Sequence, residues 1–236
     1  MDEEIHLKFN SYLKQYLEMD ILGVKINCPY WMNKMAFGRV VLRGFLNGKG
    51  DVSGIKNELL KRLNILSPDK QFGLTEENIR KFAKREKIGI DCSGFVYRVL
   101  DELIRLNYKK CHIANLAEIF RGGIDKTSAR MMTSTDFCTP VEEVVDFQLG
   151  DIIRLWEGKH IAIIIDITEK EITYAHSSSL STKIQGVHTS VIRIIRHNGN
   201  LQKQAWEEKT RKEENFGKKH FNPKRGDGVF RLRIFS

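Results

Sequence analysis

The chain has 236 residues, the length of one large domain or of one domain with a substantial extension. Hydrophobic residues make up 41% and charged residues 29%, as in a soluble globular protein. The formal net charge of +9 gives a basic surface that attracts polyanions without selecting nucleic acid, an acidic cell-wall polymer or anionic lipid. A solvated surface with a lysine bias explains the same charge.

The composition and the first residues exclude two classes of membrane-directed segment. The start, MDEEIHLKFNSYLKQ, has no basic region followed by an apolar one, so it predicts an amphipathic helix and not a signal peptide. The longest apolar stretch, 161–167, contains Asp166 and is too short to span a bilayer. We therefore expect a cytoplasmic protein without a transmembrane segment, with non-classical export to the cell wall as the alternative.

The first part of the chain, residues 1–88, is predicted to be mostly helical and to pack on the rest. An opening helix with apolar residues at helical spacing should end at Gly23. A turn-rich patch follows at 27–30, and then a glycine-spaced region. A second helix follows Ser53, and a third begins at Thr75, a residue suited to an N-cap.

The second part, residues 89–236, begins with the segment Gly89 to Gly94, which opens a strongly amphipathic helix. A further helix is expected over 113–120, ended by glycines. The polar stretch 125–139 is expected to be a loop. The apolar stripe of the amphipathic helix consists of Phe95, Val96, Val99, Leu100, Leu103 and Ile104.

From Leu149 the hydrophobic pattern becomes that of strands joined by short turns. Helices first and strands after predict an α+β fold with a C-terminal, mainly antiparallel sheet. The expected strands cover 151–156, 160–168, 172–177, 190–196 and 228–235.

A charged insert, 197–225, separates the last two expected strands. It holds eight Lys or Arg and four Asp or Glu. The i,i+4 pairs Glu207–Arg211 and Glu208–Lys212 favour a solvated surface helix, with a polyanion-binding arm as the alternative.

Four cysteines are present, none of them in a C-x-x-C pair, so the sequence predicts neither a zinc nor a redox site. Without an export signal, reduced thiols are expected. We expect Cys28, Cys111 and Cys138 to be small buried apolar residues.

Cys92 differs from the other cysteines because it stands at the start of the amphipathic helix. A helix N-terminus and a nearby imidazolium both lower a thiol pKa, and the thiolate is the nucleophile that attacks amides. The backbone N–H groups at the same terminus can hold an oxyanion. Cys92 is therefore a candidate nucleophile, although a lone cysteine at a helix start is more often structural.

Two histidines strengthen the catalytic interpretation. His160 begins an isoleucine-rich strand and His176 lies near the end of the next. A hairpin turn at 168–170 would bring them opposite or diagonal to one another, about 5 Å apart if they share a face. His176 could then orient His160 as the third member of a triad does, whereas a one-residue slip would separate them.

Four segments in order resemble the NlpC-type peptidases, a papain-like family of cell-wall hydrolases. The segments are Asp91-Cys92-Ser93-Gly94-Phe95-Val96, Leu149-Gly150-Asp151-Ile152-Ile153, His160-Ile161-Ala162-Ile163 and Tyr174-Ala175-His176-Ser177. The resemblance covers roughly 89–179. It implies a papain-like core, a Cys92–His160–His176 triad and cleavage of amide bonds in peptidoglycan stem peptides, often between γ-D-glutamate and a diamino acid.

The resemblance also suggests residues around the substrate. The family has a tyrosine that helps the oxyanion site, and Tyr30 in Pro29-Tyr30-Trp31 is similar, although it lacks the following glycines and lies far upstream of Cys92. A core role for Tyr30 is an equal alternative. Asp91 and Ser93 match positions that recognise a substrate amine, and a turn aspartate and a helix-start serine are equal alternatives.

The remaining candidates are weaker, and two other functions stay open. His188 and His197 are expected at the surface, and Cys111-His112 is expected to be structural. Neither a phosphate loop nor metal-ligand spacing occurs, so no metal or cofactor is expected. The alternatives are hydrolysis of a cytoplasmic amide, and a catalytically weak protein that binds an acidic polymer through its basic surface.

Overall fold

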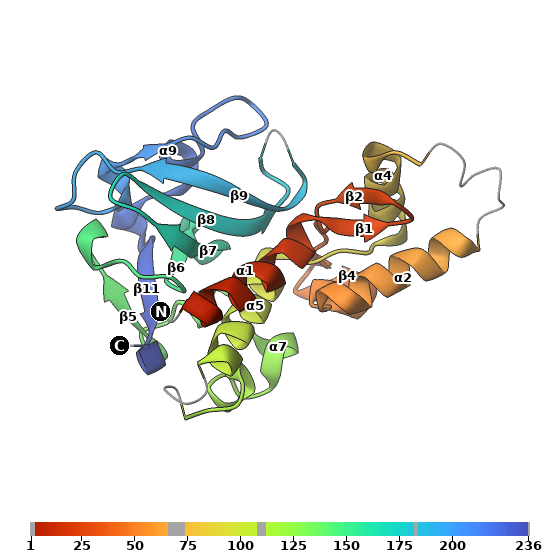
Figure 1. The fold of residues 1–236 in the computed structure, drawn as a ribbon, viewed down its shortest axis with the longest axis horizontal. Coiled ribbons are helices and arrows are strands. Elements are labelled where there is room, and N and C mark those ends of the chain that lie inside the picture. The colour runs from red at the N-terminus through yellow and green to blue at the C-terminus, as the bar shows by residue number, and fades with distance from the viewer. Residues whose placement is uncertain (1–2, 66–73, 108–111, 182–183, 236) are drawn as a thin grey trace.

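The computed structural model describes residues 3–65, 74–107, 112–181 and 184–235, and it has the mixed α+β fold that the sequence predicts (Figure 1). Its centre is a seven-stranded antiparallel sheet in the order β10-β9-β8-β7-β6-β11-β5. Figure 1 shows α1 and α5 lying against this sheet, with α2 and α4 farther from it. None of the helices in the described part of the chain is long and apolar enough to span a membrane.

The three helices predicted in the first part of the chain are present as α1 (Glu3–Leu17), α2 (Val52–Asn64) and α4 (Glu76–Glu86). The N-cap of α4 is Thr75, as predicted, and its side chain accepts a hydrogen bond from the N–H of Asn78. The N-cap of α2 is Asp51, which starts that helix slightly before the predicted position.

Two hairpins interrupt this helical part, and the sequence prediction missed both. The opening helix ends at Leu17 and not at Gly23, which instead lies in a tight turn with φ of 85°. A glycine in a left-handed conformation is as typical of a hairpin turn as of a helix end, so the pattern was ambiguous. The hairpin strands are β1 (Met19–Ile21) with β2 (Val24–Ile26), and β3 (Lys34–Ala36) with β4 (Arg39–Leu42).

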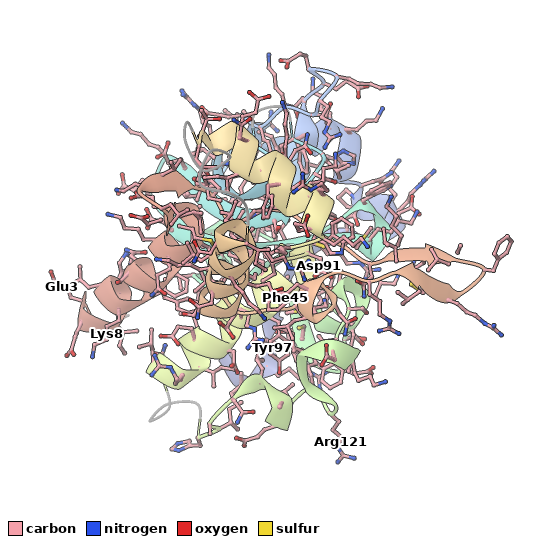
Figure 2. The ribbon with its side chains drawn as sticks, turned by 90° about the vertical axis from the view of Figure 1, so that its right-hand side faces the viewer. Glu3, Lys8, Phe45, Asp91, Tyr97 and Arg121 are labelled. Atoms are coloured by element: carbon pink, nitrogen blue, oxygen red, sulfur yellow. The ribbon has the colours of Figure 1, made fainter. Side chains whose placement is uncertain are left out.

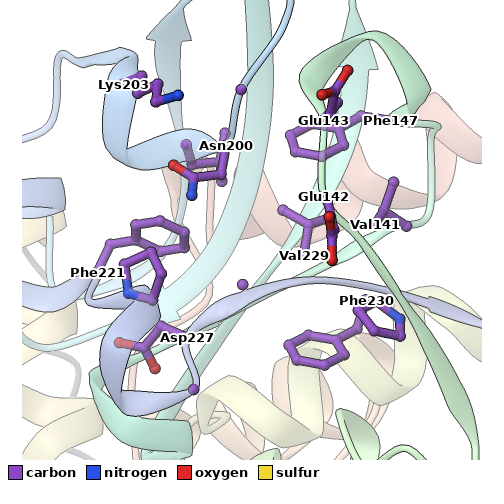
Figure 3. A pocket seen from close by; sticks show the side chains of 16 residues that line it. Val141, Glu142, Glu143, Phe147, Asn200, Lys203, Phe221, Asp227, Val229 and Phe230 are labelled. Carbon is purple, nitrogen blue, oxygen red and sulfur yellow. The ribbon is translucent and has the colours of Figure 1, made fainter.

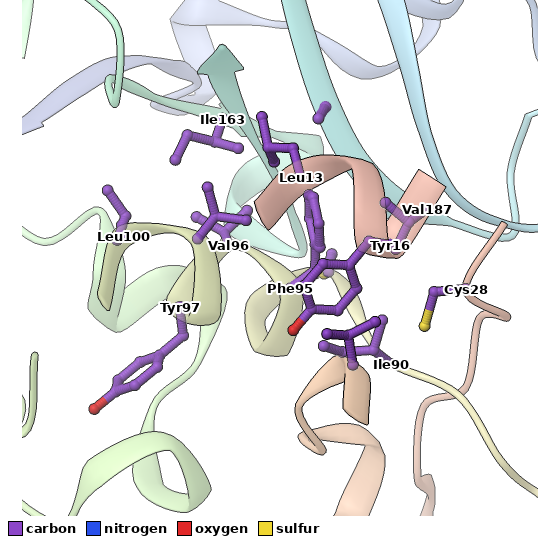
Figure 4. Packing of buried hydrophobic residues seen from close by; sticks show 14 of the residues in the cluster. Leu13, Tyr16, Cys28, Ile90, Phe95, Val96, Tyr97, Leu100, Ile163 and Val187 are labelled. Atoms are coloured by element: carbon purple, nitrogen blue, oxygen red, sulfur yellow. The ribbon is translucent and has the colours of Figure 1, made fainter. Parts of the chain in front are cut away.

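The amphipathic helix predicted after Gly89 is α5 (Cys92–Leu106), and all six residues of its predicted stripe are buried. Figure 4 shows Phe95 and Val96 of α5 close to Leu13 and Tyr16 of α1 and to Ile163 of the sheet. The rings of Tyr16 and Phe95 meet edge to face at 5.4 Å. The first part of the chain therefore shares one hydrophobic cluster with the second.

The segment after α5 is more ordered than predicted. The expected helix over 113–120 is only a 3₁₀ turn, and the expected loop over 125–139 contains regular elements. Short segments offer too few turns for hydrophobic periodicity to decide. The elements are η2 (Leu116–Glu118), α7 (Gly123–Lys126), α8 (Ala129–Met132) and β5 (Cys138–Val141).

The five predicted C-terminal strands are all present, and their alternating residues face two hydrophobic clusters. One cluster lies on the side of α5, and the other contains Tyr174, Trp206 and Phe216. The strands are β6 (Ile152–Leu155), β7 (His160–Ile167), β8 (Glu171–Ser178), β9 (Gly186–Arg193) and β11 (Gly228–Leu232). Because β9 begins four residues before its predicted start, it includes His188.

The charged insert 197–225 is not the surface helix that its charge pairs suggested. It contains β10 (Ala205–Trp206), which extends the sheet, and the short helix α9 (Phe216–His220). Glu208 is buried, so it does not form an exposed pair with Lys212. The prediction failed because buried Trp206 and Phe216 anchor the segment to the sheet, and propensity yields to such packing.

Candidate active site

Cys92 is the first residue of α5, as the sequence predicted. Asp91 is the N-cap, with an extended backbone, and its carboxylate accepts a hydrogen bond of 2.6 Å from the N–H of Gly94. A Cβ on Gly94 would lie 2.7 Å from the carbonyl oxygen of Gly48. This position therefore needs glycine, because a neighbouring backbone segment packs directly on the first turn of the helix.

The sulfur of Cys92 lies where two strands of the sheet separate. The pairing of β7 with β8 extends from Ile167 only to Ile163, which faces Ala175. Beyond that point, Ser177 of β8 donates its hydroxyl to the carbonyl oxygen of Ile90 at 2.7 Å. The backbone N–H of Ile161 donates to the sulfur of Cys92. The thiol is thus held beside the peptide that joins His160 to Ile161.

The thiol of Cys92 is not a preformed thiolate. Burial raises its pKa to about 12, and the negative charge of Asp91 contributes to the rise. The N–H groups of Ile161 and Ser93 and the positive charge of Lys49 lower the pKa but do not offset burial. The start of a helix is therefore not sufficient here to ionise the sulfur, in contrast to the expectation from sequence, and a base must take its proton.

A buried lysine that the sequence did not single out occupies the space beside Asp91 and Ser93. The ammonium of Lys49 donates to a carboxylate oxygen of Asp91 at 3.0 Å and to the hydroxyl of Ser93 at 2.5 Å. Ser93 also donates to Asp91 at 3.0 Å. The two residues that the resemblance assigned to a substrate amine therefore already hold an amine of the protein itself.

Tyr30 lies alongside Ile90, two residues before Cys92, although it is distant in sequence. The segment around it runs alongside Ile90, whose N–H donates to the carbonyl oxygen of Pro29 at 2.9 Å. A Cβ on Gly89 would lie 2.4 Å from the same oxygen, so glycine is what allows this approach. Burial raises the pKa of Tyr30, and Cys92 and Asp91 raise it further, so the phenol keeps its proton and can donate it.

His160 and His176 meet on one face of the sheet, as the hairpin prediction required. Nε2 of His160 lies 2.8 Å from Nδ1 of His176. The register pairs Ile163 with Ala175, so the two histidines are diagonal neighbours. The remaining nitrogen of the first ring, Nδ1 of His160, is the atom with which it could accept a proton from a thiol.

His188 is buried, contrary to the prediction of a surface residue. It pairs directly with His176 across β8 and β9, and their Nε2 atoms are 2.9 Å apart. The prediction failed because the start of β9 was placed after His188. His197, by contrast, is exposed as predicted.

Glu208 is the second group that sequence analysis missed. Its carboxylate oxygen Oε1 lies 3.3 Å from Nε2 of both His176 and His188. Tyr174 and Ser181 also donate their hydroxyls to this carboxylate. Burial alone would raise the pKa of Glu208, but the two imidazoles outweigh it and hold the pKa far below its usual range.

The hydrogen bonds fix the tautomers of His160 and His176 and place one proton on His188. A carbonyl oxygen only accepts, so Nδ1 of His188, 3.0 Å from the oxygen of Gly186, carries a proton. Nε2 of His176 lies 3.3 Å from the carboxylate of Glu208, which also only accepts, so this atom carries the proton of the neutral ring, and Nδ1 of His176 accepts from Nε2 of His160. Nδ1 of His160 is left with a lone pair, which is the tautomer a general base needs.

The charge states of these rings agree with that arrangement. Burial lowers the pKa of His160 well below its usual value, and the neighbouring His176 lowers it further. Burial likewise lowers the pKa of His176, although Glu208 acts in the opposite direction. Both rings are therefore uncharged at neutral pH, as a base and its orienting partner should be.

Two pockets lie near different parts of the sheet. Figure 3 shows one, with a cavity volume of about 470 Å³, between Val141 and Asn200; none of the predicted site residues is among those that line it. The other, of about 720 Å³, reaches His188, Glu208 and Ser181. His176, His188 and Glu208 are also the group in the described residues that could hold a metal ion.

Cys28 and Cys138 are free and buried, as predicted, and Cys111 lies outside the described residues. Burial raises the pKa of the Cys138 thiol to about 12 and also raises that of Cys28. Comparisons with protein-family models, with curated proteins and with solved structures find no match for this chain.

Proposed function

We propose that this protein is a cysteine hydrolase of amide bonds, with Cys92 as nucleophile, His160 as general base and His176 as the residue that orients it. Two observations carry the proposal. The Cys92 sulfur at the start of α5 lies against the N–H of Ile161, and His160, the residue before Ile161 in β7, is hydrogen-bonded to His176. A helix-start thiol beside an oriented imidazole is the arrangement that nucleophilic amide hydrolysis requires.

The reaction begins from a neutral thiol and a neutral imidazole. Nδ1 of His160 takes the proton of Cys92 as the sulfur attacks the amide carbonyl, and the resulting imidazolium is stabilised through His176 by the charge of Glu208. His160 then gives the proton to the leaving amine. Water, activated by the same ring, hydrolyses the acyl-enzyme.

Two donors are available for the oxyanion. The first N–H groups of α5, apart from that of Gly94, which Asp91 accepts, are at the helix N-terminus, and burial keeps the phenol of Tyr30 protonated in the segment alongside Ile90. Together they would stabilise the tetrahedral intermediate from two sides. In this proposal Tyr30 is a catalytic residue and not only part of the core.

The proposed substrate class rests on the sequence resemblance. We propose a peptidoglycan stem peptide or a similar γ-glutamyl amide. The ammonium of Lys49 already pairs with Asp91 and Ser93. In this proposal these two residues therefore support the turn 91–94 at the start of α5, the active-site turn, and do not bind a substrate amine.

The test is incubation of the protein with muropeptides, followed by mass analysis of the products. The expected result is a new pair of products cut at one amide bond, absent with Cys92→Ala. The buried Cys138→Ala variant is the matched control and should retain the activity. Equal product formation by Cys92→Ala and the unmodified protein would exclude the mechanism, and a negative result with muropeptides but cleavage of free γ-glutamyl amides would indicate a smaller substrate.

A further inference from the structure

Behind the proposed catalytic pair, three buried side chains converge on one point. We propose that this chain binds one divalent transition-metal ion of the zinc type through Nε2 of His176, Nε2 of His188 and Oε1 of Glu208. The three residues come from β8, β9 and the segment after β10. Strand pairing brings them together, which is why their spacing in the sequence matches no metal-binding motif.

The distances between the three donor atoms fit a tetrahedral ion. The two Nε2 atoms are 2.9 Å apart, and each lies 3.3 Å from Oε1 of Glu208. Zinc bonds of about 2.0–2.1 Å in a tetrahedron put neighbouring donors roughly 3.3–3.4 Å apart. An ion could therefore enter with only small movements of the rings.

Each proposed ligand is also held from behind in the way metal ligands usually are. Nδ1 of His188 donates to the carbonyl oxygen of Gly186 at 3.0 Å, and Nδ1 of His176 lies 2.8 Å from His160. The second oxygen of Glu208 accepts the hydroxyl of Tyr174. Such outer hydrogen bonds fix the orientation of the rings and of the carboxylate toward an ion.

The donor set and the surroundings favour zinc over hard cations. Two imidazoles and one carboxylate suit zinc, whereas magnesium and calcium prefer oxygen ligands. Ser181 supplies a hydroxyl 2.9 Å from Nε2 of His188 that also donates to Glu208, so a fourth ligand, this hydroxyl or a water bound to it, is at hand. The pocket of about 720 Å³ that reaches His188 and Glu208 gives an ion a route from solvent.

Metal binding would reverse the tautomers of the histidine chain, a consequence that rests on the proposed function. An ion on Nε2 of His176 needs the lone pair of that atom, so the proton of His176 moves to Nδ1 and is donated to Nε2 of His160. The proton of His160 then resides on its own Nδ1. The number of protons is unchanged, but His160 can no longer accept the proton of Cys92, so the ion acts as an inhibitor.

The test is a titration of the metal-free protein with Co²⁺, a coloured substitute for zinc. The expected result is one equivalent bound with the intense visible absorption of a tetrahedral site and without a thiolate-to-cobalt charge-transfer band. Cys92→Ala should bind equally well. Failure of the unmodified protein to bind Co²⁺, or a thiolate band that Cys92→Ala removes, would overturn the proposal.

Substitutions identify the ligands. His188→Gln and Glu208→Gln should each weaken binding by more than ~100-fold, beyond the ~10–100-fold that outer-shell changes cost. The matched controls are His197→Gln, an exposed histidine, and Glu213→Gln, an exposed carboxylate that lines the same pocket, and both should bind normally. The assignment would be contradicted if His197→Gln weakened cobalt binding as much as His188→Gln, or Glu213→Gln as much as Glu208→Gln. If a ligand variant fails to fold, the titrations of the unmodified protein and of Cys92→Ala decide the question.

The effect on catalysis is measured separately. One equivalent of Zn²⁺ should abolish amide hydrolysis by the unmodified protein, a chelator should restore it, and His197→Gln should respond in the same way. Full activity of the zinc-loaded protein would disprove the tautomer reversal while leaving the site in place. If the metal-free protein hydrolyses no amide, the proposed function fails and the cobalt titration still tests the site.

Discussion

Among single residues, Tyr30 gives the clearest test of how the oxyanion is held. Burial, with the charges of Cys92 and Asp91, raises the pKa of its phenol, which therefore stays protonated, while a hydrogen bond from Ser179 lowers that pKa. We expect Tyr30→Phe to lower kcat about 100-fold, the lower end of the effect of removing one oxyanion donor, with little change in thermal stability. Steady-state kinetics with the muropeptide that the unmodified protein cleaves measure kcat. Ser179→Ala is the control, and an unchanged kcat in Tyr30→Phe would return Tyr30 to a core role.

Lys49 tests whether the ion pair under the active-site turn is structural. Lys49 and Asp91 are both buried and 3.0 Å apart. Lys49→Met should cost about 3–5 kcal/mol in the free energy of unfolding, because it leaves an unpaired buried carboxylate. Asp91→Asn keeps a side-chain oxygen for the N-cap, so the double variant should recover part of that loss. Urea unfolding of all four proteins checks this, and strictly additive losses would show that the pair is not coupled.

The reactivity of Cys92 should depend on pH as that of an ordinary buried thiol does. Burial raises its pKa to about 12, so the thiolate is a small fraction at neutral pH and grows about tenfold with each pH unit. We expect alkylation by iodoacetamide to accelerate about tenfold per unit from pH 7 to about pH 10, without a plateau, as that fraction grows. Mass analysis of the labelled peptide measures the rate, with Cys92→Ala as the blank. A plateau near neutral pH would instead show a preformed thiolate–imidazolium pair.

Some residues of the candidate site could be predicted from local sequence patterns and others could not. Cys92, His160 and His176 lie in segments with strong local patterns, and a single hairpin brings the two histidines together. Lys49, Glu208 and Tyr30 reach the site from distant segments whose positions depend on long-range packing. Glu208 in particular followed an i,i+4 charge pattern that local propensity favours but that burial of Trp206 overrides. No local rule reports such contacts.

At the scale of elements, the long periodic segments were predicted and the short ones were not. α5 and the strands β6 to β8 each have a clear hydrophobic period, and the structure contains them close to their predicted bounds. The hairpins of the first part have strands of only three or four residues, too short for a period to appear. Their turns, which contain glycine in a left-handed conformation, were the available signal.

The hairpin of β3 and β4 projects from the body of the molecule and has a strained tip (Figure 2). Phe37 is fully exposed and has a φ of 50°. This left-handed conformation costs a residue other than glycine about 1–2 kcal/mol. Asn adopts this conformation more readily. We expect Phe37→Asn to stabilise the protein by up to ~1 kcal/mol, because strain is relieved and no packing is lost. Calorimetric melting checks this, and Phe37→Val, which keeps the strain, should not be stabilised.

At the scale of the whole molecule, the hydrophobic cluster on the α5 side joins both ends of the chain. It includes Phe9 of α1, Ile55 of α2 and Leu232 of β11. The part before residue 89 therefore supplies one wall of the core that positions Cys92, and it is not an independent appendage. Segments that share a core in this way are expected to unfold together.

Phe9 tests this shared core because it is wholly buried at the contact between α1 and the cluster. Phe9→Ala should lower the free energy of unfolding by about 3–5 kcal/mol, the usual cost of deleting a buried aromatic ring. Urea unfolding followed by tryptophan fluorescence and by the alkylation of Cys92 should give coincident transitions in the variant as in the unmodified protein. Leu7→Ala, on the exposed face of the same helix, should change little. A different outcome would be a first transition in which the tryptophan fluorescence of the N-terminal part changes while Cys92 stays protected from alkylation. The first part of the chain would then be a separate folding unit, and the turn 91–94 that carries Cys92 would not depend on it.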